Sequence, residues 1–118
     1  MEDYILDNEG YPTDEWIKFI QIFTLDTMPI MEFVELLRNN WWSPDWGFHL
    51  KRKYNNYRKL YLSTGGWSGN DETIEAILSN FTLQYLLGYS QWNVGGHYIF
   101  NIRINEIEKE NNVIKKEV

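Results

Sequence analysis

The feature that most limits the fold of this chain is a stretch of eight residues, Ser63-Thr64-Gly65-Gly66-Trp67-Ser68-Gly69-Asn70, with three glycines around one tryptophan. It separates a strand-like run that ends at Leu62 from a helix-like run that begins at Asp71. Glycine allows left-handed backbone and close approach of another group. A simple connection needs only one such residue, so we expect this strand-to-helix junction to be the functional centre.

Alternating apolar residues predict the strands of a sheet. The first hairpin is expected from residues 46–51 and 58–63, with a turn at 54–57. A third strand is expected over Phe81, Leu83, Tyr85 and Leu87, which occupy every second position. After a turn at 92–96, a fourth strand is expected over residues 98–104.

Helical spacing of apolar residues predicts three helices. The first covers 14–23, with Thr13 as its N-cap. The second covers 28–38, with Thr27 as its cap and Pro29 in its first turn. The third follows Asn70 as N-cap and ends near Asn80, which we expect in a left-handed conformation.

Together these elements predict an α+β fold of order ααββαββ. Two hairpins form an antiparallel four-stranded sheet with helices on one face, in a single domain of residues 1–118. Residues 1–12 are expected to be irregular, and the charged tail 105–118 to hold a short C-terminal helix. The second face of the sheet would serve as a ligand floor or as the contact of a homo-oligomer.

Composition narrows the classes of function. The 118 residues include no cysteine, which excludes disulfides and fits a reducing cytoplasm. The acidic N-terminus is not that of a signal peptide, and no apolar run approaches the roughly 20 residues of a membrane span. The formal net charge of −6 argues against a membrane partner and against direct binding of nucleic acid. We expect no cofactor and no metal site, because ligand spacings for metals are absent.

Aromatic residues make up 17% of the chain, including six tryptophans. Trp41, Trp42 and Trp46 stand close together before the first hairpin, either as packing between helix and sheet or as a wall for a planar ligand. A cluster of lysines and arginines within residues 38–60 is either a soluble hairpin tip or a patch that attracts an anion. We expect this cluster to lie beside the glycine stretch.

A glycine-rich turn before a helix suits an anionic ligand. Asp71 and Glu72 would repel a phosphate seated on the helix itself, so the turn should hold a sugar or base edge, with Trp67 stacked on a ring. No catalytic residue is assigned, although a grouping of His97, Ser68 and Asp71 stays open. The candidate ligand-binding residues are Trp42, Trp46, Arg58, Ser63, Thr64, Gly65, Gly66, Trp67, Ser68, Gly69, Asn70, Gly96 and His97.

Three segments resemble a group of small, uncharacterised phage-encoded proteins: residues 62–70, residues 95–100 (Gly95-Gly96-His97-Tyr98-Ile99-Phe100) and residues 41–47. The resemblance covers about residues 33–102. Val94 stands where those proteins often have a basic residue, which weakens a phosphate site there. The resemblance implies an anti-defence role, in which a nucleotide immune signal is bound and sequestered without cleavage.

Two other functions compete with this hypothesis. The acidic first 37 residues could mimic nucleic acid and block a host defence nuclease. A small nucleotide hydrolase is the third alternative. A protein that sequesters its ligand would release it unchanged on heating, whereas a hydrolase would not.

Overall fold

The computed structural model describes residues 6–54, 57–93 and 95–103. Its elements, in chain order, are α1 (Asp14–Gln21), α2 (Ile30–Asn39), α3 (Pro44–Gly47), β1 (Phe48–Tyr54), β2 (Tyr57–Ser63), α4 (Ser68–Leu78), α5 (Phe81–Leu87), β3 (Tyr89–Asn93) and β4 (His97–Arg103). The fold class is therefore α+β, as the sequence predicts. The expected C-terminal helix lies outside the described residues.

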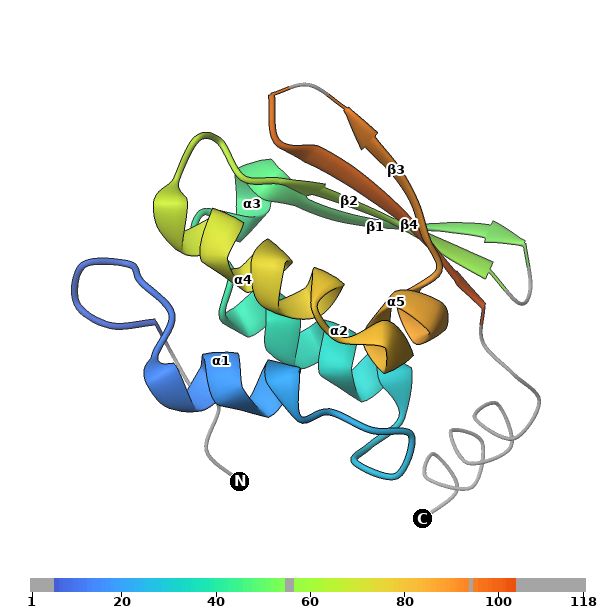
Figure 1. Cartoon of the computed structure of the whole chain (residues 1–118). Helices are drawn as coiled ribbons and strands as arrows, with labels where there is room; N and C mark the ends of the chain where they lie inside the picture. Colours follow the sequence, from blue (N-terminus) through green and yellow to red (C-terminus); the bar gives the residue numbers. More distant parts are fainter. Residues whose placement is uncertain (1–5, 55–56, 94, 104–118) are drawn as a thin grey trace, which may run out of the picture.

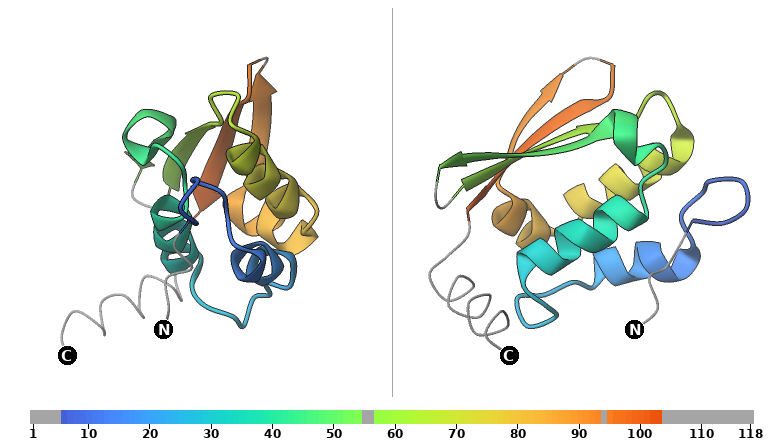
Figure 2. Two further views of the ribbon diagram at one scale, coloured as in Figure 1. Left: turned by 90° about the vertical axis from the view of Figure 1, so that its left-hand side faces the viewer. Right: turned by 180° about the vertical axis from the view of Figure 1, so that it is seen from behind.

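The strands form one antiparallel sheet in the order β1-β2-β4-β3. Its register pairs Phe48 with Leu62 and Leu60 with Phe100. Helices α1, α2, α4 and α5 all lie on one side of this sheet (Figure 1). Two further views show the same arrangement, with α3 at one end of the sheet (Figure 2).

The core fills the space between the sheet and these helices. Leu60 and Leu62 of β2 point into it and are fully buried, as are Phe100 and Ile102 of β4. Because side chains alternate across a strand, the residues between them face the side of the sheet that none of the described helices covers. The helices contribute the apolar residues that share one face, such as Trp16 and Phe33, whose rings stack at 5.8 Å.

The predicted start of α1 is confirmed. The hydroxyl oxygen of Thr13 accepts a hydrogen bond from the amide of Trp16 at 3.2 Å, and Asp14 occupies the first turn. The second helix starts later than predicted, because Pro29 is its N-cap. Thr27 instead accepts a hydrogen bond from the amide of Thr24, which closes the loop between the two helices.

The strand predicted over residues 81–87 is wrong, because this segment is helix α5. Leu83 and Leu87, four residues apart, are fully buried, while Phe81 and Tyr85 point to solvent. Asn80 is not left-handed as expected, but extended. Its side-chain oxygen accepts hydrogen bonds from the amides of residues 82 and 83 and so caps the helix.

The second hairpin is consequently shifted along the chain. Its first strand is β3, so Trp92 and Asn93, which were expected in the turn, pair with β4. Residues 44–47, expected as a loop leading into a strand at Trp46, form the single helical turn α3, and β1 begins at Phe48. The element order is thus αααββααββ rather than ααββαββ.

Candidate functional site

The glycine turn, residues 64–67, joins β2 to α4 at one end of the sheet. The amide of Trp67 donates to the carbonyl of Thr64 at 2.9 Å, and both central residues, Gly65 and Gly66, have positive φ of 63° and 73°. Tight turns with two positive φ values strongly favour glycine at both positions. Two of the three glycines therefore follow from the turn itself.

The third glycine is explained by close packing. A Cβ atom on Gly69 would lie 2.9 Å from Nε1 of Trp67 and 3.1 Å from the ring of Pro12. The glycine content that suggested a ligand site from sequence thus has a structural cause at all three positions. The argument for a site must come from the side chains around the turn.

Trp67 does not face an open notch, contrary to the expectation that it stacks on a ligand. Its ring stacks on Trp42, with centroids 4.8 Å apart and planes at 22°, and contacts Tyr11 at 5.0 Å. Its indole N–H donates to the carbonyl of Gly10 at 3.0 Å. This aromatic stack of Tyr11, Trp67 and Trp42 holds the N-terminal segment against the glycine turn.

Asn70 was expected to cap the third helix, but α4 starts at Ser68 and Asn70 is buried within its first turn. Its side-chain oxygen accepts from the amide of Trp42 at 3.0 Å, and its Nδ2 donates to the carbonyl of the same residue at 3.1 Å. Asn70 therefore fixes the position of the tryptophan-rich segment. It is too buried to contact a ligand.

Trp46 is the exposed aromatic residue at the glycine turn. Its side chain is 57% exposed, and a Cβ on Gly65 would lie 2.9 Å from its ring, so the indole rests on the turn. A Cβ on Gly66 would meet no atom within 4 Å, which shows open space there. No hydrogen bond within the described part of the chain engages the amides of these two glycines.

His97 lies beside the same turn. It pairs with Ser63 across β4 and β2, and its Nδ1 shares a hydrogen bond of 2.7 Å with the hydroxyl of Ser63. The strands are joined to the turn by the amide of Thr64, which donates to the carbonyl of Gly96 at 2.9 Å. Gly96 has a φ of 79°, and a Cβ there would collide with the side chain of Thr64.

The grouping of His97 with Ser68 and Asp71 is not assembled. The hydroxyl of Ser68 donates to Tyr11 at 3.4 Å, and His97 is bonded to Ser63 instead. Among the residues that the structure describes, no carboxylate is hydrogen-bonded to His97, and no group of three or more potential metal ligands is found. The residues around the glycine turn can therefore contact a bound molecule, but they do not form the grouping of His97, Ser68 and Asp71.

Arg58 is not at this site, contrary to expectation. The glycine turn follows the end of β2, whereas Arg58 stands near its beginning, opposite Ile102 of β4. Five residue steps along a strand separate it from Ser63, a distance of roughly 17 Å. The basic cluster belongs to the other end of the first hairpin and cannot hold the phosphate of a ligand bound at the turn.

The structure thus sorts the predicted site residues into three groups. Those exposed or half-exposed around one end of the sheet are Trp46, Ser63, Gly65, Gly66 and His97. Those that build the support are Trp42, Thr64, Trp67, Ser68, Gly69, Asn70 and Gly96, of which Trp42 and Ser68 are also exposed, and Arg58 lies elsewhere. Sequence reasoning missed Gly10 and Tyr11, for which the chain carries no local signal.

The comparisons with known proteins add no identification. The chain matches no protein-family model, and no curated protein or solved structure is significantly similar to it. The resemblance of residues 33–102 to phage proteins therefore stays a prediction. Among the described helices, none is long and apolar enough to cross a membrane.

Proposed function

We propose that this protein binds a nucleotide-like ligand at the glycine-turn end of its sheet. The observation that carries the proposal is the position of Trp46, an exposed indole resting on Gly65 beside two backbone amides that have no hydrogen-bond partner in the described chain. Indole faces stack on planar rings, and free amides bind anionic or carbonyl oxygens. A nucleotide presents both kinds of group.

The remaining contacts come from the pair formed by Ser63 and His97. Both are polar, both are accessible, and both can donate to or accept from a base edge or a sugar hydroxyl. The ring of the ligand would lie on Trp46, with its polar edge toward this pair. Trp67 and Asn70 support the site from behind without touching the ligand.

The biological role that fits this binding is sequestration. The resemblance to phage proteins suggests an anti-defence protein that binds a nucleotide immune signal and keeps it intact in the host cytoplasm. Binding alone is sufficient for such a role, so no turnover and no cofactor are required. Homo-oligomer formation is compatible with the proposal and is not needed for it.

The test is calorimetry against a panel of mononucleotides, cyclic dinucleotides and ADP-ribose derivatives. At least one member should bind, and Trp46→Ala should weaken that binding tenfold or more. Phe81→Ala is the matched control, because Phe81 is 83% exposed on α5 and should leave affinity unchanged. The proposal fails if no member binds, if both variants behave alike, or if the ligand recovered after heating has been cleaved.

A second candidate function is supported by the acidic surface of the helical layer. All described aspartates and glutamates are exposed, and they include Asp14 and Glu15 on α1 and Glu32 on α2. Such a surface could occupy the basic groove of a defence nuclease as a nucleic-acid mimic. Neutralising these three residues together should abolish salt-sensitive capture of the nuclease, whereas Trp46→Ala should not affect it.

A further inference from the structure

The charges of this protein are separated between its two layers. None of the acidic residues that the structure describes lies in a strand, whereas six lysines and arginines do. The net charge of −6 is therefore an average over two unlike surfaces and does not describe the sheet. The strand cations are Lys51, Arg52, Lys53, Arg58, Lys59 and Arg103.

Three of these cations share the side of the sheet that lies away from all the helices the structure describes. In β2, Leu60 and Leu62 point into the core, so Lys59 and Tyr61 must point to the opposite side. Lys51 of β1 pairs with Lys59 and therefore lies on the same side. Tyr57, at the beginning of β2, also lies on this side, and so does its partner Arg103 in β4. We name these residues, Lys51, Tyr57, Lys59, Tyr61 and Arg103, the outer face.

On the outer face the cations surround tyrosine rings. The ammonium groups of Lys51 and Lys59 lie 5.6 Å and 5.7 Å from the ring centroid of Tyr61. The guanidinium of Arg103 lies 5.9 Å from the ring centroid of Tyr57. Each ring is therefore held next to positive charge while remaining partly exposed.

The pairing of the two lysines is unfavourable on its own. Lys51 stands directly opposite Lys59 on the outer face. Like charges at directly opposed positions destabilise an antiparallel pair. Among the strands that the structure describes, no acidic residue stands beside this lysine pair. An anion lying along the strands would convert this repulsion into attraction.

We propose that the outer face binds single-stranded nucleic acid. The phosphates would contact Lys51, Lys59 and Arg103, and unpaired bases would stack on Tyr57 and Tyr61, since aromatic platforms with basic neighbours are the usual way in which open sheets hold single strands. The four residue steps from Tyr61 to Tyr57 give a track about 13 Å long, enough for two or three stacked bases.

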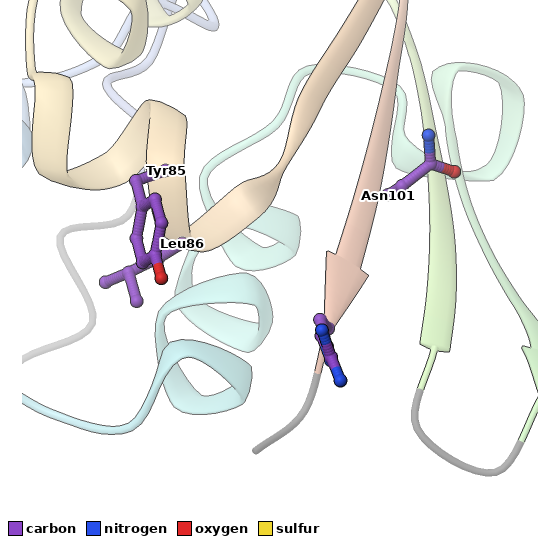
Figure 3. A pocket seen from close by; sticks show the side chains of 4 residues that line it. Tyr85, Leu86 and Asn101 are labelled. Carbon is purple, nitrogen blue, oxygen red and sulfur yellow. The ribbon is translucent and has the colours of Figure 1, made fainter.

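A hollow beside Arg103 lies toward the helical layer, because α5 forms part of its wall. It measures about 270 Å³ and is lined by Tyr85, Leu86, Asn101 and Arg103, in the corner between α5 and the end of β4 (Figure 3). Tyr85 is 82% exposed there. The hollow gives a further nucleotide an aromatic surface beside Arg103. Paired bases could not use either surface, so duplexes should bind more weakly.

This inference goes beyond the proposed small-ligand site, because its residues are different and lie farther along the strands. The two can be tested separately. A variant that loses oligonucleotide binding should still bind a nucleotide at Trp46. A variant that loses nucleotide binding should still bind oligonucleotides. Binding of a mononucleotide that is insensitive to Lys51 and Lys59 would support the first site without bearing on the outer face.

The experiment is fluorescence anisotropy with labelled single-stranded RNA and DNA of 4 to 16 nucleotides and with a duplex control. We expect binding that strengthens with length and weakens with salt, with a slope near −2 for about three phosphate contacts. The double variant Lys51→Gln/Lys59→Gln should weaken binding at least tenfold and flatten the slope. Tyr61→Leu should weaken it, whereas Tyr61→Phe should retain it.

The matched control is Lys18→Gln, which removes an exposed cation from α1 on the helical layer and should leave affinity unchanged. The double lysine variant relieves the repulsion between the lysines but loses both contacts with Tyr61, so its thermal unfolding is measured in parallel, and its affinity is compared at a temperature where it is folded. The proposal is overturned if no oligonucleotide binds, if Lys18→Gln is equally damaging, or if polyphosphate binds as well as the oligonucleotides. Dimerisation that depends on the two lysines would overturn it as well.

Discussion

The aromatic stack makes a prediction about Trp67 that separates a structural role from a ligand-binding one. Trp67→Ala removes two ring contacts, each contributing about 0.5–1.5 kcal/mol, and one hydrogen bond, contributing about 1 kcal/mol. The free energy of unfolding should therefore fall by about 3 kcal/mol. In a domain of this size that corresponds to a lower midpoint by roughly 12 °C.

The measurement is urea unfolding followed by far-UV circular dichroism, with linear extrapolation to water. Trp67→Phe should lose only about 1 kcal/mol, because a smaller ring still fills the stack but cannot donate to Gly10. Trp46→Ala is the matched control, the same change at an exposed indole, and should stay within about 0.5 kcal/mol of the wild type.

A spectroscopic signature adds a readout that stability alone does not give. The indoles of Trp42 and Trp67 are close and nearly parallel, so their transitions should couple and give a paired band in circular dichroism. Trp67→Phe should abolish that band, and Trp46→Phe should not. If Trp67→Ala unfolds like the wild type while Trp46→Ala is destabilised, the stack is not structural and the sequence-based role of Trp67 stands.

Two further predictions concern the junctions around α5. Asn80→Ala should reduce the free energy of unfolding by about 2–4 kcal/mol, because it removes the helix cap and the hydrogen bonds that its amide donates to the carbonyls of Ile20 and Phe23, whereas Asn80→Ser should recover the capping part, both measured by urea unfolding. Gly88→Ala should lower the thermal midpoint by several degrees, since Gly88 has a φ of 61° and a Cβ there would collide with the carbonyl oxygen of Asn101, and a midpoint equal to the wild type would contradict this explanation.

Where a local signal decided the structure, the sequence predicted it correctly. Thr13 followed by an acidic turn and apolar residues at helical spacing gave the start of α1. Alternation predicted the core-facing residues Leu60 and Leu62 of β2 and Phe100 of β4, and all three are fully buried. These signals depend on residues within about one turn or one strand of each other.

The segment 81–87 shows where such signals fail. Apolar residues at every second position satisfy the strand pattern, yet two of them are four residues apart and equally satisfy a helix. Asn80 decides between the two, because its amide also donates to carbonyls at the end of α1, about 60 residues earlier in the chain. No local pattern reveals that contact.

The glycine stretch shows a different failure. Its composition was unusual, but a turn with two positive φ values and one close helix contact account for Gly65, Gly66 and Gly69 without a ligand. Trp67 turned inward because Gly10 and Tyr11, from a segment expected to be irregular, supply its partners. The exposed indole that rests on the turn is instead Trp46, on a helical turn that the sequence did not predict.

The net charge of the chain does not describe the charge of any one of its surfaces, and the reason is geometrical. A sheet covered on one side exposes only alternate residues, so the charge that a partner meets is set by one strand face and not by the whole chain. Counted in this way, β2 places Lys59 and Tyr61 together on the open side, and its pairing adds Lys51. An acidic protein can therefore present a basic, aromatic surface, and the salt dependence of binding to that surface should follow its own cations rather than the net charge of −6.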